Sequence, residues 1–83
     1  MDTEAIIEQH IEPTLVDTLG FQVANAVLTR ATVCYVNASG NEEQRYSAFV
    51  HSICSDERVF DAWGAVETVG QEKAWLDLIA RAP

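Results

Sequence analysis

The longest apolar stretch of the chain is residues 21–38, FQVANAVLTRATVCYVNA, which contains a single charged residue, Arg30. A helix that is apolar around most of its circumference must be covered on most sides. Since a chain of 83 residues has few other elements to cover it, we expect a buried central helix and a homodimer that forms through it. The polar positions of this helix form one narrow stripe, made of Gln22, Asn25, Thr29 and Thr32. The expected interface consists of Ala24, Leu28, Ala31 and Tyr35.

A first helix is predicted before this segment, because apolar residues recur there every four positions. These residues are Ile7, Ile11, Leu15 and Leu19. Asp2 or Thr3 can cap the helix, and Gly20 is suited to end it. Pro13 interrupts the pattern, because it lacks a backbone donor and crowds the carbonyl of Gln9, so we expect a kink or a restart there.

Residues 32–36 leave an alternative open, because TVCYV is rich in residues that favour strands. With 44–53 as the return strand, this segment would form a hairpin at about 29–53 in an α+β fold. Two features favour helices instead. Residues 24–31 are good helix formers, and Asn41 with Gln44 forms a capping box, the reciprocal pattern that opens a helix.

The second half of the chain predicts three further helices. The first, about 42–54, places four apolar residues on one face, and Ser55 can cap the next, which ends before Gly64. Thr68 and Gln71 form a second capping box, which opens a last helix that ends near Arg81. The whole chain, 1–83, is therefore expected to form one all-α domain, a small bundle of four to five helices. The residues expected inside it are Tyr46, Phe49, Val50, Ile53, Val59, Phe60, Trp63, Ala74, Trp75, Leu78 and Ile79.

The charge balance excludes some partners. The net charge is −8, and residues 1–20 contain five acids and no Lys or Arg. Since affinity for nucleic acids and anionic membranes comes largely from cations, we expect neither as a partner. The 21–38 segment is also too short and too polar to be a good membrane span. A basic groove on another protein remains a possible target for so acidic a chain.

The two cysteines fit no zinc or redox motif, because Cys34 and Cys54 form no CxxC pair. The N-terminus carries acids rather than a basic region before an apolar run, so no secretory signal is indicated. We therefore expect a cytoplasmic protein with free thiols.

Candidate chemistry is sparse. Glu4, Glu8 and Glu12 stack at four-residue steps, but such a run is usually a solvated face, and no Glu-x-x-His motif is present. His51 and Cys54 are three residues apart on one predicted helix, which is the sharpest enzymatic reading, yet a buried structural thiol is commoner. We therefore expect no metal site, no cofactor and no catalysis.

The aromatic residues allow a further hypothesis, a ligand cavity between the helices. Tyr46, Phe49, His51, Phe60, Trp63 and Trp75 could line a cavity between helices that takes a small apolar ligand, although the core needs the same rings. The sequence favours a non-catalytic protein-interaction or regulatory module that self-associates. Its rivals are a binder of a small apolar ligand and an acidic decoy for a basic groove.

Overall fold

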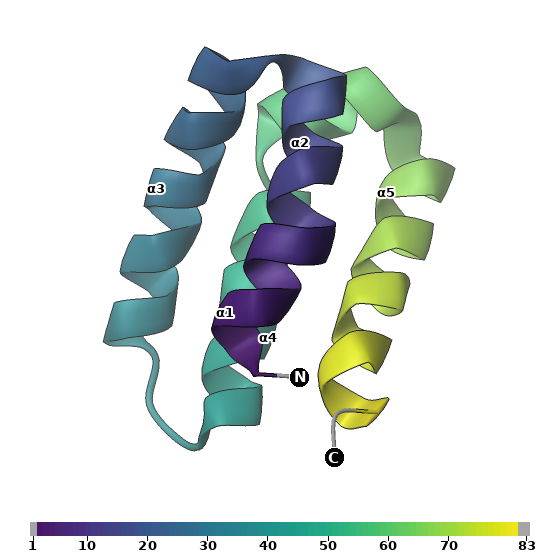
Figure 1. The fold of residues 1–83 in the computed structure, drawn as a ribbon. Helices are drawn as coiled ribbons and strands as arrows, with labels where there is room; N and C mark the ends of the chain where they lie inside the picture. The colour runs from purple at the N-terminus through teal and green to yellow at the C-terminus, as the bar shows by residue number, and fades with distance from the viewer. Residues whose placement is uncertain (1, 82–83) are drawn as a thin grey trace.

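The computed structural model describes residues 2–81, and all the regular structure in this range is helical. A first helix runs up through α1 (Thr3–Ile6), the π-helical turn η1 (Ile7–Ile11) and α2 (Glu12–Leu19). Then α3 (Phe21–Asn37) descends, α4 (Glu42–Cys54) ascends, and α5 (Glu57–Arg81) crosses the top and descends, so that both termini lie at the same end (Figure 1). The predicted all-α bundle is confirmed.

The first helix begins at Asp2, whose Oδ1 accepts a hydrogen bond from the backbone N–H of Ala5 at 2.8 Å. The interruption expected at Pro13 is a restart: α2 begins at Glu12, with Pro13 in its first turn. The π turn lies just before the proline, and the N–H of Glu12 donates to the carbonyl of Ile7, five residues back. A π turn takes up one extra residue without breaking the helix.

Burial along this helix explains where the extra residue falls. Thr3, Ile6, Ile11 and Leu15 are buried, and the five-residue step from Ile6 to Ile11 coincides with the π turn. In a regular α-helix the neighbouring buried positions are three or four residues apart. The extra residue therefore keeps both ends of the helix facing the core.

Gly20 separates the first helix from α3, as predicted. Its φ of 82° and ψ of 163° lie in a region that residues with a side chain rarely adopt. α3 then packs against α2 on one side and α4 on the other. Only part of its circumference is covered: Ala24, Val27 and Ala31 are buried, whereas its outward face is exposed.

The predicted capping box at the start of α4 is confirmed. Asn41 Oδ1 accepts a hydrogen bond from the N–H of Gln44, and Gln44 Oε1 accepts one from the N–H of Asn41, both at 2.9 Å. The alternative hairpin at about 29–53 is wrong, because 32–36 lies inside α3 and 44–53 inside α4. The tertiary packing of the bundle therefore outweighs the strand preference of TVCYV.

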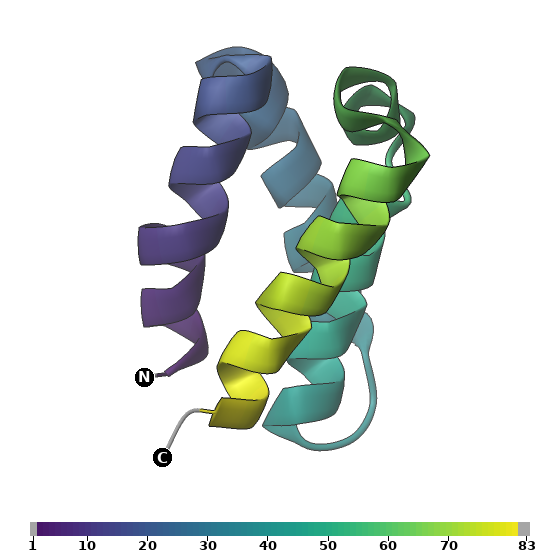
Figure 2. The same ribbon diagram turned by 90° about the vertical axis from the view of Figure 1, so that its right-hand side faces the viewer.

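Two predictions about helix starts in the second half were wrong. Asp56, not Ser55, caps α5, since its Oδ1 accepts from the N–H of Arg58 at 3.0 Å. Thr68 does not cap a helix either: it lies inside α5, and its hydroxyl donates to the carbonyl of Gly64 at 2.7 Å. The break is at Gly64 itself, where φ is 81° and ψ is 170°, and there α5 changes direction (Figure 2).

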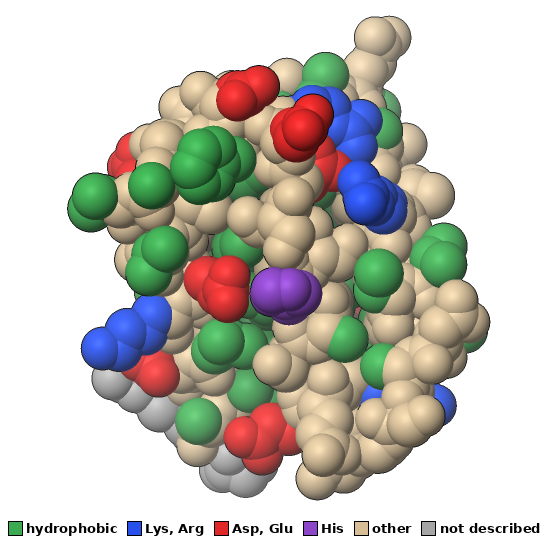
Figure 3. All heavy atoms as spheres, turned by 180° about the vertical axis from the view of Figure 1, so that it is seen from behind, with side chains coloured by type: hydrophobic (Ala, Val, Ile, Leu, Met, Phe, Trp, Pro, Cys, Tyr) green, Lys and Arg blue, Asp and Glu red, His purple; other side chains and the backbone are tan. Residues whose placement is uncertain are grey.

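The core is one cluster in which all four helices take part. Phe60 and Ala74, which were expected inside, are exposed, while Trp63, Leu78 and Ile79 are half-buried. Seen from behind, apolar side chains gather over the bend of α5 (Figure 3), where Phe60, Val66 and Val69 are exposed. The buried apolar residues are Ile6, Ile11, Leu15, Ala24, Val27, Ala31, Tyr46, Phe49, Val50, Ile53, Cys54, Val59 and Trp75.

Candidate functional site

A groove lies between the first helix and α3. The two helices are joined at Gly20 and diverge toward the other end of the bundle, where α1 and η1 stand away from α3 (Figures 1 and 2). The space between them contains two adjoining hollows of about 380 Å³ and about 250 Å³. Ile7, Glu12, Thr32 and Phe49 line both hollows, so the two form one continuous groove.

The floor of the groove is apolar. Phe49 reaches it from α4 and is only 3% exposed, and half-buried Ile7, Leu28 and Tyr35 extend it along the two walls. The position of Phe49 on the buried face of α4 was predicted, but its role beneath a groove was not. These side chains offer a recessed apolar surface to whatever enters between the helices.

One rim of the groove is acidic. Glu4, Glu8 and Glu12 all line the larger hollow, and all three are exposed. In a regular α-helix each four-residue step turns the side chain by about 40°, so Glu4 and Glu12 would point about 80° apart. The π turn takes back part of this rotation, which is why three carboxylates from separate turns can line one hollow.

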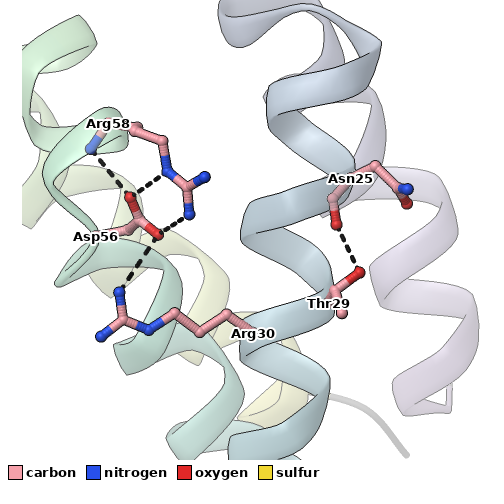
Figure 4. A network of polar contacts seen from close by, with 5 residues as sticks. All are labelled: Asn25, Thr29, Arg30, Asp56 and Arg58. Atoms are coloured by element: carbon pink, nitrogen blue, oxygen red, sulfur yellow. Dashed lines mark hydrogen bonds and ion pairs between the residues drawn. The ribbon is translucent and has the colours of Figure 1, made fainter.

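The opposite rim is polar and uncharged. It is made by the predicted polar stripe of α3, of which Asn25, Thr29 and Thr32 line the groove. The hydroxyl of Thr29 donates to the carbonyl of Asn25 (Figure 4) and that of Thr32 to the carbonyl of Leu28, each at 2.8 Å. These two hydroxyls therefore donate within their own helix and do not need a second chain as a partner.

Tyr35 lies at one end of the groove, where its hydroxyl donates a hydrogen bond to Glu42. This bond raises the pKa of Tyr35 and lowers the pKa of the Glu42 carboxyl. The nearby hydroxyl of Thr3 also lowers the pKa of Glu42, but less than Tyr35 does. Thr3 Oγ1 is buried and has no hydrogen-bond partner within the usual distance and angle limits. Arg45 lies 5.9 Å from the centre of the Tyr35 ring, within cation–π range.

The four residues expected in a dimer interface do not share one surface. Ala24 and Ala31 are 0% exposed inside their own chain, and Leu28 and Tyr35 are half-buried along the groove. The large apolar residues that α3 exposes are Phe21 at 70%, Val23 at 36%, Val33 at 54% and Val36 at 63%. Any second copy on α3 would therefore meet these side chains rather than the buried alanines.

The aromatic residues expected around a ligand cavity are also separated. Tyr46 and Trp75 belong to the core, where the Tyr46 hydroxyl donates to the carbonyl of Trp75 at 2.6 Å and burial raises the pKa of Tyr46 to about 12. Trp63 stacks at a tilt on Trp75, with ring centres 5.8 Å apart, and its Nε1 donates to Thr18 at 3.1 Å. His51 and Phe60 are exposed, and of the six only Phe49 lines the groove.

The Cys54–His51 pair does not form a nucleophile and base. Cys54 is 7% exposed, and burial together with Glu72 raises the pKa of its thiol to about 12, which opposes thiolate formation. His51 instead lies near Ser55, with 3.3 Å between Nε2 and Oγ, and its Nδ1 is 4.0 Å from Glu72 Oε1. The order of groups resembles a hydrolytic triad, but 4.0 Å is beyond hydrogen-bond reach and the His51 side chain is 75% exposed.

The densest polar network has a structural role. Asp56 is 3% exposed, and its two oxygens accept hydrogen bonds from Arg58 Nε and Nη2 at 2.9 and 2.8 Å, while Arg30 lies 3.9 Å away (Figure 4). Arg58 is the main cause of the lowered pKa of the Asp56 carboxyl. The network ties the start of α5 to α3.

Within residues 2–81 no group of three or more metal-ligating side chains is assembled, and no helix is long and apolar enough to cross a membrane. The three glutamates of the acidic rim were interpreted from the sequence as a solvated face and were not assigned to a site. Their four-residue spacing was visible, but the groove was not, because it depends on how far α3 diverges from the first helix. Comparison of the chain with models of known protein families finds no matching family, and comparisons with curated proteins and with solved structures find no match either.

Proposed function

We propose that the protein is a non-catalytic, cytoplasmic interaction module that receives the apolar side chains of a partner helix in the groove between the first helix and α3. The observation that carries this proposal is the recessed apolar floor, formed by Phe49 with Ile7 and Leu28, between two exposed polar rims. Amphipathic helices commonly bind proteins by laying an apolar face into such a groove.

The shape of the groove favours a helix over a small molecule. The larger hollow has a volume of about 380 Å³. It continues into the second hollow along the axis of the first helix, past Ile7 and Glu12. A ligand that follows this course contacts several turns of both walls, as a helix does.

The test fills the groove without touching the core. Thr32 lines both hollows and is exposed, so Thr32→Trp should occupy the groove while the bundle keeps its stability. Val33→Trp, one residue along on the outward face of α3, is the matched control. The ligands are helical peptides selected against the protein from a display library with a fixed leucine face.

We expect Thr32→Trp to weaken peptide binding at least tenfold and Val33→Trp to leave it unchanged. Fluorescence anisotropy measures the affinity, and amide chemical shifts locate the bound peptide. Peptides that bind the outward face of α3 or the bend of α5 would overturn the proposal, as would selection that yields no binder at all. Competition with a small apolar dye, and not with peptides, would favour the ligand-binding alternative.

A homodimer through α3 is the second candidate, and the exposure of Val33 and Val36 favours it. Sedimentation at micromolar concentration tests this candidate directly. Val33→Glu and Val36→Glu should dissociate such a dimer without unfolding the chain, because neither valine is part of the core. A native protein that sediments as a monomer would refute it.

A further inference from the structure

We propose that the partner of the groove is a cationic amphipathic helix from a different protein, with Lys or Arg residues one turn apart that meet Glu4, Glu8 and Glu12. This inference rests on the proposed function, because it concerns the chemistry of the helix that the same groove receives. It adds the charge, the spacing and the origin of that helix.

The acidic rim matches the spacing of such a helix. Glu4, Glu8 and Glu12 span eight residues, or about 12 Å at the usual rise of 1.5 Å per residue. A partner helix packed alongside repeats its own side chains at the same rise. Cations at four-residue steps, next to an apolar face in the groove, would therefore each meet one carboxylate.

Among the residues that the structure describes, no cation pairs with the three carboxylates. The ion pairs found within residues 2–81 involve Asp56 and Glu72, and none includes a carboxylate of the acidic rim. The residues that line the two hollows include these three glutamates and no Lys or Arg. Like charges at four-residue spacing repel one another, and a cationic partner would relieve this repulsion.

A second copy of the chain cannot supply the cations. The five basic residues are Arg30, Arg45, Arg58, Lys73 and Arg81, and no two of them are three or four residues apart. A net charge of −8 also repels a second copy from the acidic rim. The helix must therefore come from another protein, and its basic character also separates it from nucleic acids and anionic lipids, which the rim repels.

The test is a selection among helical peptides that differ in charge at three positions. A display library of 18-residue helices keeps one leucine face and varies three flanking positions, four residues apart, among Lys, Gln and Glu. Selection is run on the native protein and on the triple variant Glu4→Gln, Glu8→Gln, Glu12→Gln. The matched control, Glu57→Gln, Asp61→Asn, Glu67→Gln, removes three exposed acids that do not line the groove.

We expect Lys to be enriched at the three positions with the native protein and with the control variant, but not with the triple variant. A selected Lys peptide should bind the triple variant about tenfold more weakly, the combined effect of three exposed ion pairs, and binding to the native protein should weaken as salt is raised. Circular dichroism should show that both variants stay folded.

The outcomes separate the two proposals. If selected peptides bind the groove by chemical-shift mapping but show no preference for Lys, the charge inference is wrong and the proposed function stands. If Lys is enriched equally with the triple variant, the rim does not select the partner and the inference is again wrong. If no peptide binds at the groove, both proposals are wrong.

Discussion

The first helix and α5 are both interrupted, but the two irregularities do different things to the chain. In the first helix the π turn at Ile7–Ile11 inserts one residue into the hydrogen-bond ladder, and the helix continues in the same direction. In α5, Gly64 adopts φ 81° and ψ 170°, and the helix turns from crossing the top of the bundle to descending beside it. The first irregularity keeps both ends of the helix facing the core, and the second changes the direction of the helix.

This difference matters for the groove. Because the first helix keeps its direction, it presents a straight wall with Glu4, Glu8 and Glu12 along one rim. The bend of α5 instead leaves Phe60, Val66 and Val69 exposed around the turn, and none of the three lines the groove. The groove therefore places acidic and polar side chains directly beside its apolar floor.

The largest effect is expected from insertion of one alanine after Gln9, an exposed residue within the π turn. The π turn already takes up one extra residue, so a second extra residue should rotate residues 2–8 by about 100° relative to the rest of the helix. Ile6 and Ile11, both 0% exposed, could then no longer share the core, and the free energy of unfolding should fall by about 2–4 kcal/mol, as for the loss of one large buried side chain.

Urea denaturation measures this loss, and Gln9→Ala, which keeps the length of the chain, should change stability by no more than about 0.5 kcal/mol. The insertion should also abolish peptide binding at the groove. An unchanged denaturation midpoint for the insertion would show that the burial of Ile6 and Ile11 does not depend on the number of residues between them.

The next effect concerns the bend of α5. Gly64→Ala should destabilise the fold by about 1–3 kcal/mol, because its backbone lies in a region that is essentially restricted to glycine. No atom lies within 4 Å of the added Cβ, so the cost is one of backbone conformation alone. Gly70→Ala is the control: this glycine is inside the helix with free space around it, and the change should stabilise by about 0.5–1 kcal/mol. Thermal unfolding should show a lower melting temperature for Gly64→Ala and a higher one for Gly70→Ala. Equal changes in melting temperature would contradict this account of the bend.

The caps of the two interrupted helices should also differ. Asp56→Ala should lower the free energy of unfolding by about 1–2 kcal/mol, because Asp56 is buried and bonded to Arg58. Asp2→Ala should lower it by about 0.5 kcal/mol, because exposed Asp2 makes a single cap hydrogen bond. The pKa of Asp56 is lowered in the folded state, so the unfolded chain binds its proton more tightly.

The contribution of Asp56 is therefore complete at pH values above its unfolded pKa of about 3.9 and is lost as the pH falls through the lower folded pKa. Urea unfolding of the native protein and the Asp56→Ala variant at pH 7 and near pH 3 should show a smaller difference in the acid. If the difference in the free energy of unfolding were the same at both pH values, the native state would not stabilise the charged form of Asp56.

The two interruptions also show how far the sequence predicts this molecule. Helix boundaries marked by local chemistry were predictable: Asp2, Gly20, the Asn41–Gln44 capping box and the break at Gly64 all lie where expected. The start of α5 was assigned to Ser55 instead of Asp56, because two adjacent residues can both cap and only the Arg30 and Arg58 side chains favour the second. The groove was not predictable, since it depends on the angle between the first helix and α3, and the apolar patterns of the two helices do not determine that angle.

The π turn had a signal that was not used. Ile7, Ile11, Leu15 and Leu19 recur every four residues, and a regular α-helix would carry such a series about 120° around its axis. A sustained four-residue period followed by a proline therefore indicates either a supercoiled helix or an extra residue in one turn.

The smallest expected effect tests whether Pro13 or the core sets the π turn. Pro13→Ala restores a backbone donor, and if the proline alone prevented an α-helical turn, the helix would become regular and Ile6 would rotate out of the core. We expect the opposite: the π turn should persist, because Ile6 and Ile11 must both stay buried, and stability should change by less than about 1 kcal/mol. Through-hydrogen-bond NMR couplings can detect the bond from the Glu12 N–H to the Ile7 carbonyl in the variant. Its replacement by a bond to the carbonyl of Glu8 would assign the turn to the proline. Its persistence would mean that the buried positions of the first helix, and not its one helix-breaking residue, hold the acidic rim in line.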